Sequence, residues 1–153
     1  MVNYVYGDVL ASPDLVIAHG CNATGVMGSG VAKQVKEKYP NAFADYNAYC
    51  KHNPVSITLG TNVYSTQPDG KTIVNCITQE FYGRAMGIKF VSYDAVDKCF
   101  ADLAEYCDTY KIENISMPKI GAGLGGGNWS VIEAIINAHF KFHETLVNVY
   151  YVD

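Results

Sequence analysis

Two short glycine-rich segments constrain the fold of this chain more than any other feature. One runs from Gly25 to Gly30 and the other from Gly121 to Gly127. Each follows a stretch typical of a strand and precedes a stretch with helical spacing. Glycine lets the backbone adopt positive φ and lets another group approach the main chain closely. The two segments therefore predict strand-to-helix loops at equivalent places in an α/β fold.

The remaining pattern supports alternating strands and helices. We predict strands over residues 2–6, 15–19, 62–65, 72–78, 114–117 and 145–152. We predict helices over residues 31–39, 42–50 (capped by Asn41), 92–110 (capped by Ser92) and 129–142. The run 15–19 is apolar without alternation, which is typical of a strand covered on both faces. This order indicates a mixed, mostly parallel sheet with helices on both faces and ligands at the carboxyl ends of its strands.

Length, composition and charge exclude several classes of protein for this chain. With 153 residues we expect a single domain spanning 1–153, and 49% hydrophobic residues exclude disorder. The apolar runs are too short to cross a bilayer, and the start of the chain lacks a secretory signal. A net charge of −4 argues against general nucleic-acid binding. Five cysteines without a CxxC pair indicate neither a disulfide framework nor a zinc site. We expect a cytoplasmic monomer.

The glycine segments also suit a phosphate ligand, because the N–H groups of a following helix attract anions. Two such loops facing one another would suit a diphosphate, whereas the alternative interpretation is a pair of tight turns. Gly121, Gly123 and Gly126 match GxGxxG, but too little chain follows for a dinucleotide-binding βαβ unit. Neither segment ends in the Gly-Lys-Ser/Thr of a nucleotide-hydrolysing loop. No spacing predicts a metal site, and we assign no cofactor.

Four separated motifs resemble the macro domain, a family that binds ADP-ribose and related metabolites. They are Gly7-Asp8-Val9, Ala18 to Ala23, Gly28 to Ala32 and Met117 to Leu124. The likeness covers nearly the whole chain. It is greatest to the branch of ADP-ribose-1″-phosphate phosphatases and terminal ADP-ribose protein glycohydrolases, including short phage and bacterial proteins. It implies a three-layer α/β/α fold with a six-stranded sheet.

The resemblance also implies roles for residues. Asp8 would accept a hydrogen bond from the adenine amino group, and Asn22 would contact the distal ribose. Tyr150 would lie against the adenine, the alternative being a tyrosine of the core or sheet edge. The loops would hold the diphosphate through backbone N–H groups. The implied ligand-binding residues are Asp8, Val9, Asn22, Gly28, Ser29, Gly30, Val31, Ile120, Gly121, Ala122, Gly123, Leu124, Gly125 and Tyr150.

The chain departs from the glycohydrolase pattern at two positions. That branch uses a lysine and an aspartate where this chain has Gln79 and Gly125, so a covalent lysine mechanism is not expected. The catalytic residues that we predict are His19, Asn22 and Gln79. His19 would act as a general acid or orient water, the alternative being a buried core histidine. Arg84 would pair with a terminal phosphate or lie on the surface.

The expected activity is therefore hydrolysis of ADP-ribose-1″-phosphate to ADP-ribose and phosphate without a metal. Two alternatives remain open at this point. One is a non-catalytic reader of ADP-ribose or of ADP-ribosylated macromolecules. The other is a hydrolase of ADP-ribosyl or O-acetyl-ADP-ribose esters. All place a small-molecule ligand in one cleft, without a membrane partner.

Overall fold

The computed structural model of the chain describes residues 2–82 and 90–152. The strands are β1 (Val2–Tyr6), β2 (Val16–Asn22), β3 (Asn62–Thr66), β4 (Thr72–Gln79), β5 (Asn114–Met117) and β6 (Leu146–Tyr151). The helices are the 3-10 turn η1 (Val9–Ala11), α1 (Gly30–Lys38), α2 (Pro40–His52), α3 (Val55–Thr58), α4 (Tyr93–Tyr110) and α5 (Trp129–Phe140). Within the described residues, no helix is both long enough and apolar enough to cross a membrane.

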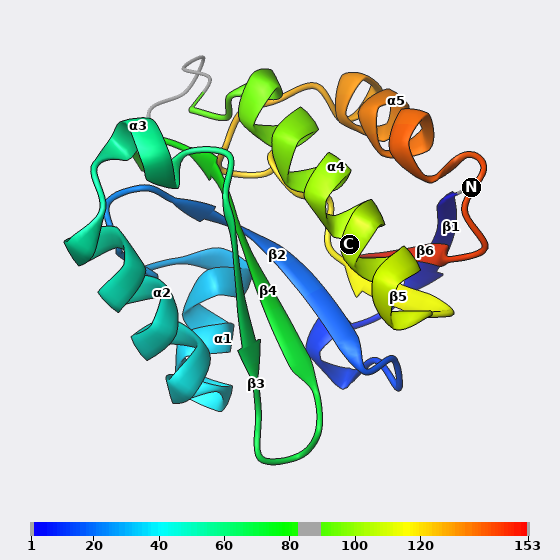
Figure 1. Cartoon of the computed structure of the whole chain (residues 1–153), viewed down its shortest axis with the longest axis horizontal. Helices are drawn as coiled ribbons and strands as arrows, with labels where there is room; N and C mark the ends of the chain where they lie inside the picture. The colour runs from blue at the N-terminus through cyan, green and yellow to red at the C-terminus, as the bar shows by residue number, and fades with distance from the viewer. Residues whose placement is uncertain (1, 83–89, 153) are drawn as a thin grey trace.

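The strands form one six-stranded sheet in the order β1-β6-β5-β2-β4-β3 (Figure 1). Only β3 runs antiparallel, against its neighbour β4, and the other neighbouring strands are parallel. This arrangement confirms the predicted mixed, mostly parallel sheet. It also brings the ends of β2, β4 and β5 to the same edge, where the two glycine loops begin.

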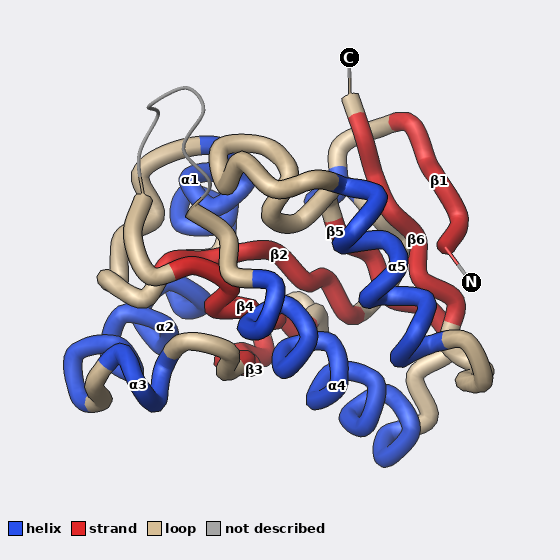
Figure 2. The backbone as a smooth tube through the Cα atoms, turned by 90° about the horizontal axis from the view of Figure 1, so that it is seen from above, coloured by secondary structure: helices blue, strands red, loops and turns tan. Residues whose placement is uncertain are grey.

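Two apolar clusters fill the space between the sheet and its helices. Helices α4 and α5 pack over one face and α1 and α2 over the other (Figures 1 and 2). Successive residues of β2 alternate between the clusters. Val16 and Ala18 face α4 and α5, whereas Ile17 faces α1 and α2. The unbroken apolar run therefore marks a strand buried on both faces, as predicted.

Several boundaries differ from the predicted ones. Helix α2 begins at Pro40 with Tyr39 as its N-cap, rather than after Asn41, because the first helical turn needs no N–H from proline. The Ser92 cap is confirmed, since its hydroxyl accepts a hydrogen bond from the Ala95 amide at 3.2 Å. Helix α5 ends at Phe140, two residues early. The short helices η1 and α3 were missed because neither is long enough to show helical periodicity.

Strand β2 continues beyond its predicted end at His19. Its last residue, Asn22, pairs with Gln79 at the end of β4. The sequence His19-Gly-Cys-Asn22 has little strand propensity, but hydrogen bonds from the neighbouring strand hold it extended. The extension places Asn22 and Gln79 side by side at the edge of the sheet.

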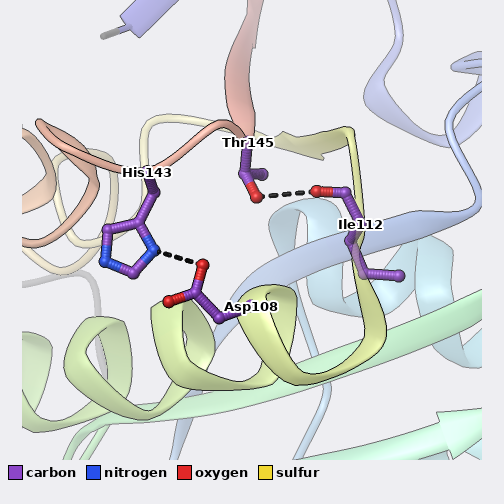
Figure 3. Close-up of polar contacts among 4 residues, drawn as sticks. All are labelled: Asp108, Ile112, His143 and Thr145. Atoms are coloured by element: carbon purple, nitrogen blue, oxygen red, sulfur yellow. Dashed lines mark hydrogen bonds and ion pairs between the residues drawn. The ribbon is translucent and has the colours of Figure 1, made fainter.

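Side-chain contacts join α4 and the loop that follows it to α5 and to the connection between α5 and β6. His143 Nδ1 donates to Asp108 Oδ1 at 2.9 Å, and Thr145 Oγ1 donates to the Ile112 carbonyl at 2.7 Å (Figure 3). His139 similarly donates to Asp97 at 2.7 Å. These two histidines therefore pair with carboxylates of α4.

Candidate functional site

A cleft of about 630 Å³ lies at the carboxyl ends of β2, β4 and β5. The two glycine segments form its opposing walls, so loops separated by almost a hundred residues in sequence share one site. The lining includes most of the predicted ligand-binding residues: Asn22, Gly28, Ser29, Gly30, Val31, Ile120, Gly121, Ala122, Gly123, Leu124 and Gly125. Gln79 lines the cleft as well.

The first loop, residues 22–30, is held by the side chain of Asn22. Its Oδ1 accepts hydrogen bonds from the Thr24 amide at 3.1 Å, the Thr24 hydroxyl at 2.7 Å and the Val26 amide at 3.3 Å. Its Nδ2 donates to the Val26 carbonyl at 2.8 Å. A carboxamide nitrogen carries two hydrogens, so a second N–H remains for a ligand. Asn22 therefore shapes the loop and still offers a donor to the cleft.

Helix α2 supports the same loop from behind. The hydroxyl of Tyr46 lies 2.6 Å from the Asn22 carbonyl and 2.8 Å from Asn22 Oδ1. Asn47 Nδ2 donates to the Gly25 carbonyl at 3.0 Å. Burial raises the pKa of the Tyr46 hydroxyl, which therefore stays a proton donor near neutral pH.

The amino end of α1 opens into the cleft. Its N-cap, Ser29, makes no side-chain capping hydrogen bond. The first N–H groups of a helix have no partner within the helix, and here they belong to the cleft-lining residues Gly30, Val31 and Ala32. These free amides, together with the partial positive charge of the helix end, favour an anionic ligand.

The second loop, residues 118–127, depends on glycine for space. Gly121 has φ +80°, and a Cβ on it would lie 2.8 Å from Val91 Cγ2. A Cβ on Gly125 would lie 2.7 Å from the Gly121 carbonyl oxygen. No side chain fits at either position without moving the loop. Glycine is therefore required by conformation and close packing at Gly121, and by close packing at Gly125.

Backbone contacts complete the second loop. The Gly127 amide donates to the Gly121 carbonyl at 2.8 Å, and the Phe90 amide donates to the Gly125 carbonyl at 2.8 Å. Within the part of the chain that the structure describes, the amides of Gly123, Leu124 and Gly125 make no hydrogen bond. Both walls thus present unpaired N–H groups, which is the chemistry that a diphosphate requires.

Gln79 lies between the loops. Its Nε2 donates to the Phe81 carbonyl at 2.7 Å, which fixes the orientation of the carboxamide. Its Oε1 then lies 3.1 Å from the position that a Cβ on Gly125 would occupy. Gln79 and Gly125 are therefore neighbours in space, and Gln79 Oε1 is placed to accept a hydrogen bond at the cleft.

The structure does not bring His19 to the cleft. Its side chain is fully buried, and Nε2 donates to Asn75 Oδ1 at 2.6 Å. Burial lowers the pKa of His19 to about 4, so the ring is neutral near pH 7. This placement does not suit the general-acid role that the sequence suggested. Successive residues of β2 point to opposite faces of the sheet, and the side chain of His19 lies on the face covered by α2.

Cys21 lines the cleft, and its Sγ lies 3.6 Å from His19 Nε2. A cysteine beside a histidine and an asparagine resembles the arrangement of thiol hydrolases. Here burial raises the pKa of the Cys21 thiol well above its usual range while lowering that of His19. The thiol consequently stays protonated and is not activated as a nucleophile.

The residues expected at the adenine are not among those that line the cleft. Asp8 is exposed, and its Oδ1 caps η1 by accepting from the Leu10 amide at 2.9 Å. Val9 is buried. Tyr150 Cδ2 lies 4.0 Å from the position of a Cβ on Gly7, so the ring packs beside the residue that precedes Asp8. Contacts of these residues with adenine stay predictions.

Some cleft residues were not singled out from the sequence as ligand contacts. Thr78 is 1% exposed, and among the described residues its Oγ1 has no hydrogen-bond partner. Lys119 lines the cleft while its Nζ lies 5.9 Å from the ring centre of Tyr4 and 5.8 Å from that of Tyr151. The position of Thr78 directly before Gln79 was the one available signal. Arg84 lies outside the described residues.

Over residues 2–82 and 90–152, no group of three or more His, Cys, Asp or Glu side chains is placed to hold a metal ion. The polar residues of the lining are Asn22, Gln79, Lys119, the thiol of Cys21 and the hydroxyl residues Ser29, Thr78 and Tyr82, beside the backbone amides.

Comparison with known proteins gives the family. The Macro domain family matches residues 18–136. The chain belongs to the macro domain family. It is 30% identical, over 99% of its length and 98% of the relative's, to a Meyerozyma guilliermondii protein named ADP-ribose 1″-phosphate phosphatase.

Two further relatives extend the comparison. The chain is 30% identical, over 92% of its length, to a Mycobacterium bovis protein named DNA ADP-ribosyl glycohydrolase, of which it spans only 39%. The solved macrodomain of Mycobacterium tuberculosis DarG superposes with a TM-score of 0.84 at 27% identity, covering 98% of this chain and 97% of that one. The predicted α/β/α macro-domain fold is thus confirmed.

Proposed function

We propose that this macro domain binds ADP-ribose and hydrolyses ADP-ribose-1″-phosphate to ADP-ribose and phosphate. The observation that carries the proposal is the cleft whose two walls both present unpaired backbone N–H groups. A diphosphate fits between them, with the nucleoside toward Asp8 and Tyr150 and the distal ribose toward Asn22 and Gln79.

Three groups would take part at the distal ribose. The free N–H of Asn22 would donate to an oxygen of the ribose or of its phosphate. Gln79 Oε1 would accept a hydrogen bond from a water molecule and orient it toward phosphorus. The water oxygen forms the new bond to phosphorus while the bond between phosphorus and the ribose oxygen breaks. One water proton passes, by way of the phosphoryl oxygens, to the departing ribose oxygen, so the products are ADP-ribose with a free hydroxyl and inorganic phosphate. The loop amides would stabilise the negative charge that develops on the phosphoryl oxygens.

A covalent mechanism is disfavoured by the same geometry. The carboxamide of Gln79 is not a nucleophile, and its nitrogen is engaged by the Phe81 carbonyl. An acid at position 125 would force its Cβ within 2.7 Å of the Gly121 carbonyl oxygen. The second loop therefore excludes the acid that the glycohydrolase branch uses.

The test is release of phosphate from ADP-ribose-1″-phosphate by the purified chain. We expect multiple turnovers, and we expect Gln79→Ala to lower kcat about tenfold or more while leaving ADP-ribose affinity nearly unchanged. AMP, a phosphomonoester without the distal ribose, is the control substrate and should not be hydrolysed. ADP-ribose binding without phosphate release would favour the alternative function, a non-catalytic reader.

One relative favours a further alternative, hydrolysis of ADP-ribosyl bonds on a macromolecule. Its name, DNA ADP-ribosyl glycohydrolase, describes an activity on ADP-ribosylated DNA. Release of free ADP-ribose from an ADP-ribosylated polymer, without phosphate release from the 1″-phosphate, would support that activity over the proposed phosphatase activity.

The five cysteines are free thiols, which favours a reducing compartment such as the cytoplasm. A monomer is the oligomeric state that we propose.

A further inference from the structure

Tyr46 is a buried side chain outside the cleft lining whose hydroxyl contacts Asn22, a residue expected to recognise the ligand. It is 0% exposed and comes from α2, whereas the cleft is built from the strand ends and the two loops. Its hydroxyl reaches through the core to Asn22 at the edge of the sheet. Tyr46 can therefore influence the site without contacting a ligand.

The groups around Asn22 Oδ1 are two amide N–H donors and two hydroxyls, each of which can donate one hydrogen bond. They are the Thr24 amide, the Thr24 hydroxyl, the Val26 amide and, at 2.8 Å, the Tyr46 hydroxyl. If the carboxamide were rotated by half a turn, its NH₂ group would face the Thr24 and Val26 amides, which cannot accept, and its oxygen would face the Val26 carbonyl. The donors thus fix the oxygen toward the protein.

Tyr46 contributes to this arrangement through a buried hydroxyl. Its hydroxyl lies within hydrogen-bonding distance of both the carbonyl and the side-chain oxygen of Asn22, and 3.5 Å from the Val26 carbonyl. A single buried oxygen atom therefore contacts both the backbone and the side chain of Asn22. With the oxygen fixed, the second N–H of the carboxamide makes no hydrogen bond among the described residues, and Asn22 lines the cleft.

We propose that the Tyr46 hydroxyl is a positioning group that makes the cleft selective for ligands bearing a distal ribose. The inference rests on the proposed function, in which Asn22 meets that ribose. The hydrogen bonds of Tyr46 go to Asn22 and Val26 rather than to the phosphate-binding amides of α1 and the second loop. Removing the hydroxyl should therefore weaken recognition of the distal ribose and leave recognition of the diphosphate intact.

The experiment compares ADP-ribose with ADP by calorimetric titration of Tyr46→Phe and the unaltered chain. We expect Tyr46→Phe to lower ADP-ribose affinity about tenfold and to change ADP affinity by less than about twofold. A general distortion of the first loop would lower both affinities together, which would overturn the proposal. Equal ADP-ribose affinity of Tyr46→Phe and the unaltered chain would overturn it as well.

Tyr39→Phe is the matched control. Tyr39 is also nearly buried, but its hydroxyl donates to Asp69 Oδ2 at 3.0 Å, away from the cleft. It should lose stability without any change in the ADP-ribose to ADP affinity ratio. A mutant cycle of Tyr46→Phe with Asn22→Ala adds a second test, since Tyr46→Phe should have little effect on that ratio once Asn22 is absent.

The two proposals fail differently. If the unaltered chain binds no ADP-ribose, the proposed function is wrong and the role of Tyr46 falls with it. If the unaltered chain binds ADP-ribose and Tyr46→Phe keeps the same selectivity over ADP, only the role of Tyr46 is wrong.

Discussion

The two walls of the cleft offer the same chemistry but are held in shape by different means. The first loop is fastened by side chains, chiefly Asn22, with support from Tyr46 and Asn47. The second is fastened by backbone-to-backbone contacts that leave no room for side chains at Gly121 and Gly125. The first loop should therefore be sensitive to removing polar atoms, and the second to adding any atom at all.

The largest effect is expected at Gly125. Gly125→Ala would place a Cβ 2.7 Å from the Gly121 carbonyl oxygen, and backbone cannot yield as a flexible side chain would. We expect the free energy of unfolding to fall by about 3 kcal/mol or more, measured by urea denaturation.

Gly123→Ala is the control for that substitution, since a Cβ there meets nothing within 4 Å. It should change stability by less than about 1 kcal/mol in either direction. Equal effects of the two alanines would mean that close packing does not shape the second loop.

The next effect concerns the strand that leads into the first loop. Unfolded histidine binds a proton near pH 6.5, whereas burial lowers the pKa of His19 to about 4 in the folded chain. Well above pH 6.5, His19 is neutral in both the folded and the unfolded chain, so its burial costs no stability through protonation. As pH falls toward 4, the unfolded state takes up the proton first and stability decreases.

This titration should remove about 2 kcal/mol from the free energy of unfolding between about pH 8 and about pH 5. His19→Gln, which cannot titrate, should have a shallower pH dependence over that interval. An unchanged slope in His19→Gln would show that His19 is not buried as a neutral ring.

Asn22→Ala comes third. It removes the acceptor for Thr24 and Val26 and one donor, so the free energy of unfolding should fall by about 1.5 kcal/mol. Asn3→Ala, which removes one exposed side-chain bond to Asn148, should cost less than about 0.5 kcal/mol. Thermal denaturation of both variants measures the difference. Similar losses would contradict the role of Asn22 in holding the first loop.

The smallest effect is expected at Ser29. An N-cap serine normally stabilises its helix by about 1 kcal/mol, but this hydroxyl makes no capping hydrogen bond. Ser29→Ala should therefore change stability by less than about 0.5 kcal/mol in a thermal scan. A larger loss would mean that the amides at the start of α1 are already occupied by Ser29 and are not free for an anion.

The sequence predicted those parts of the molecule that depend on local pattern. The alternation of apolar runs and helical spacing was sufficient for the sheet, and the glycine segments identified both walls. It did not predict the direction of the His19 side chain. That direction depends on how far β2 extends beside β4, which is a tertiary property. The supporting role of Tyr46 was equally hidden, because helical spacing marks a core residue without showing what its hydroxyl meets.

The most direct test of the account is a calorimetric titration of the purified chain with ADP-ribose, with AMP as the comparison. The account predicts saturable binding of one ADP-ribose per chain, clearly tighter than AMP, because AMP cannot bridge the two loops. Equal affinity for the two ligands, or no binding of ADP-ribose at millimolar concentration, would contradict a diphosphate site between the glycine loops.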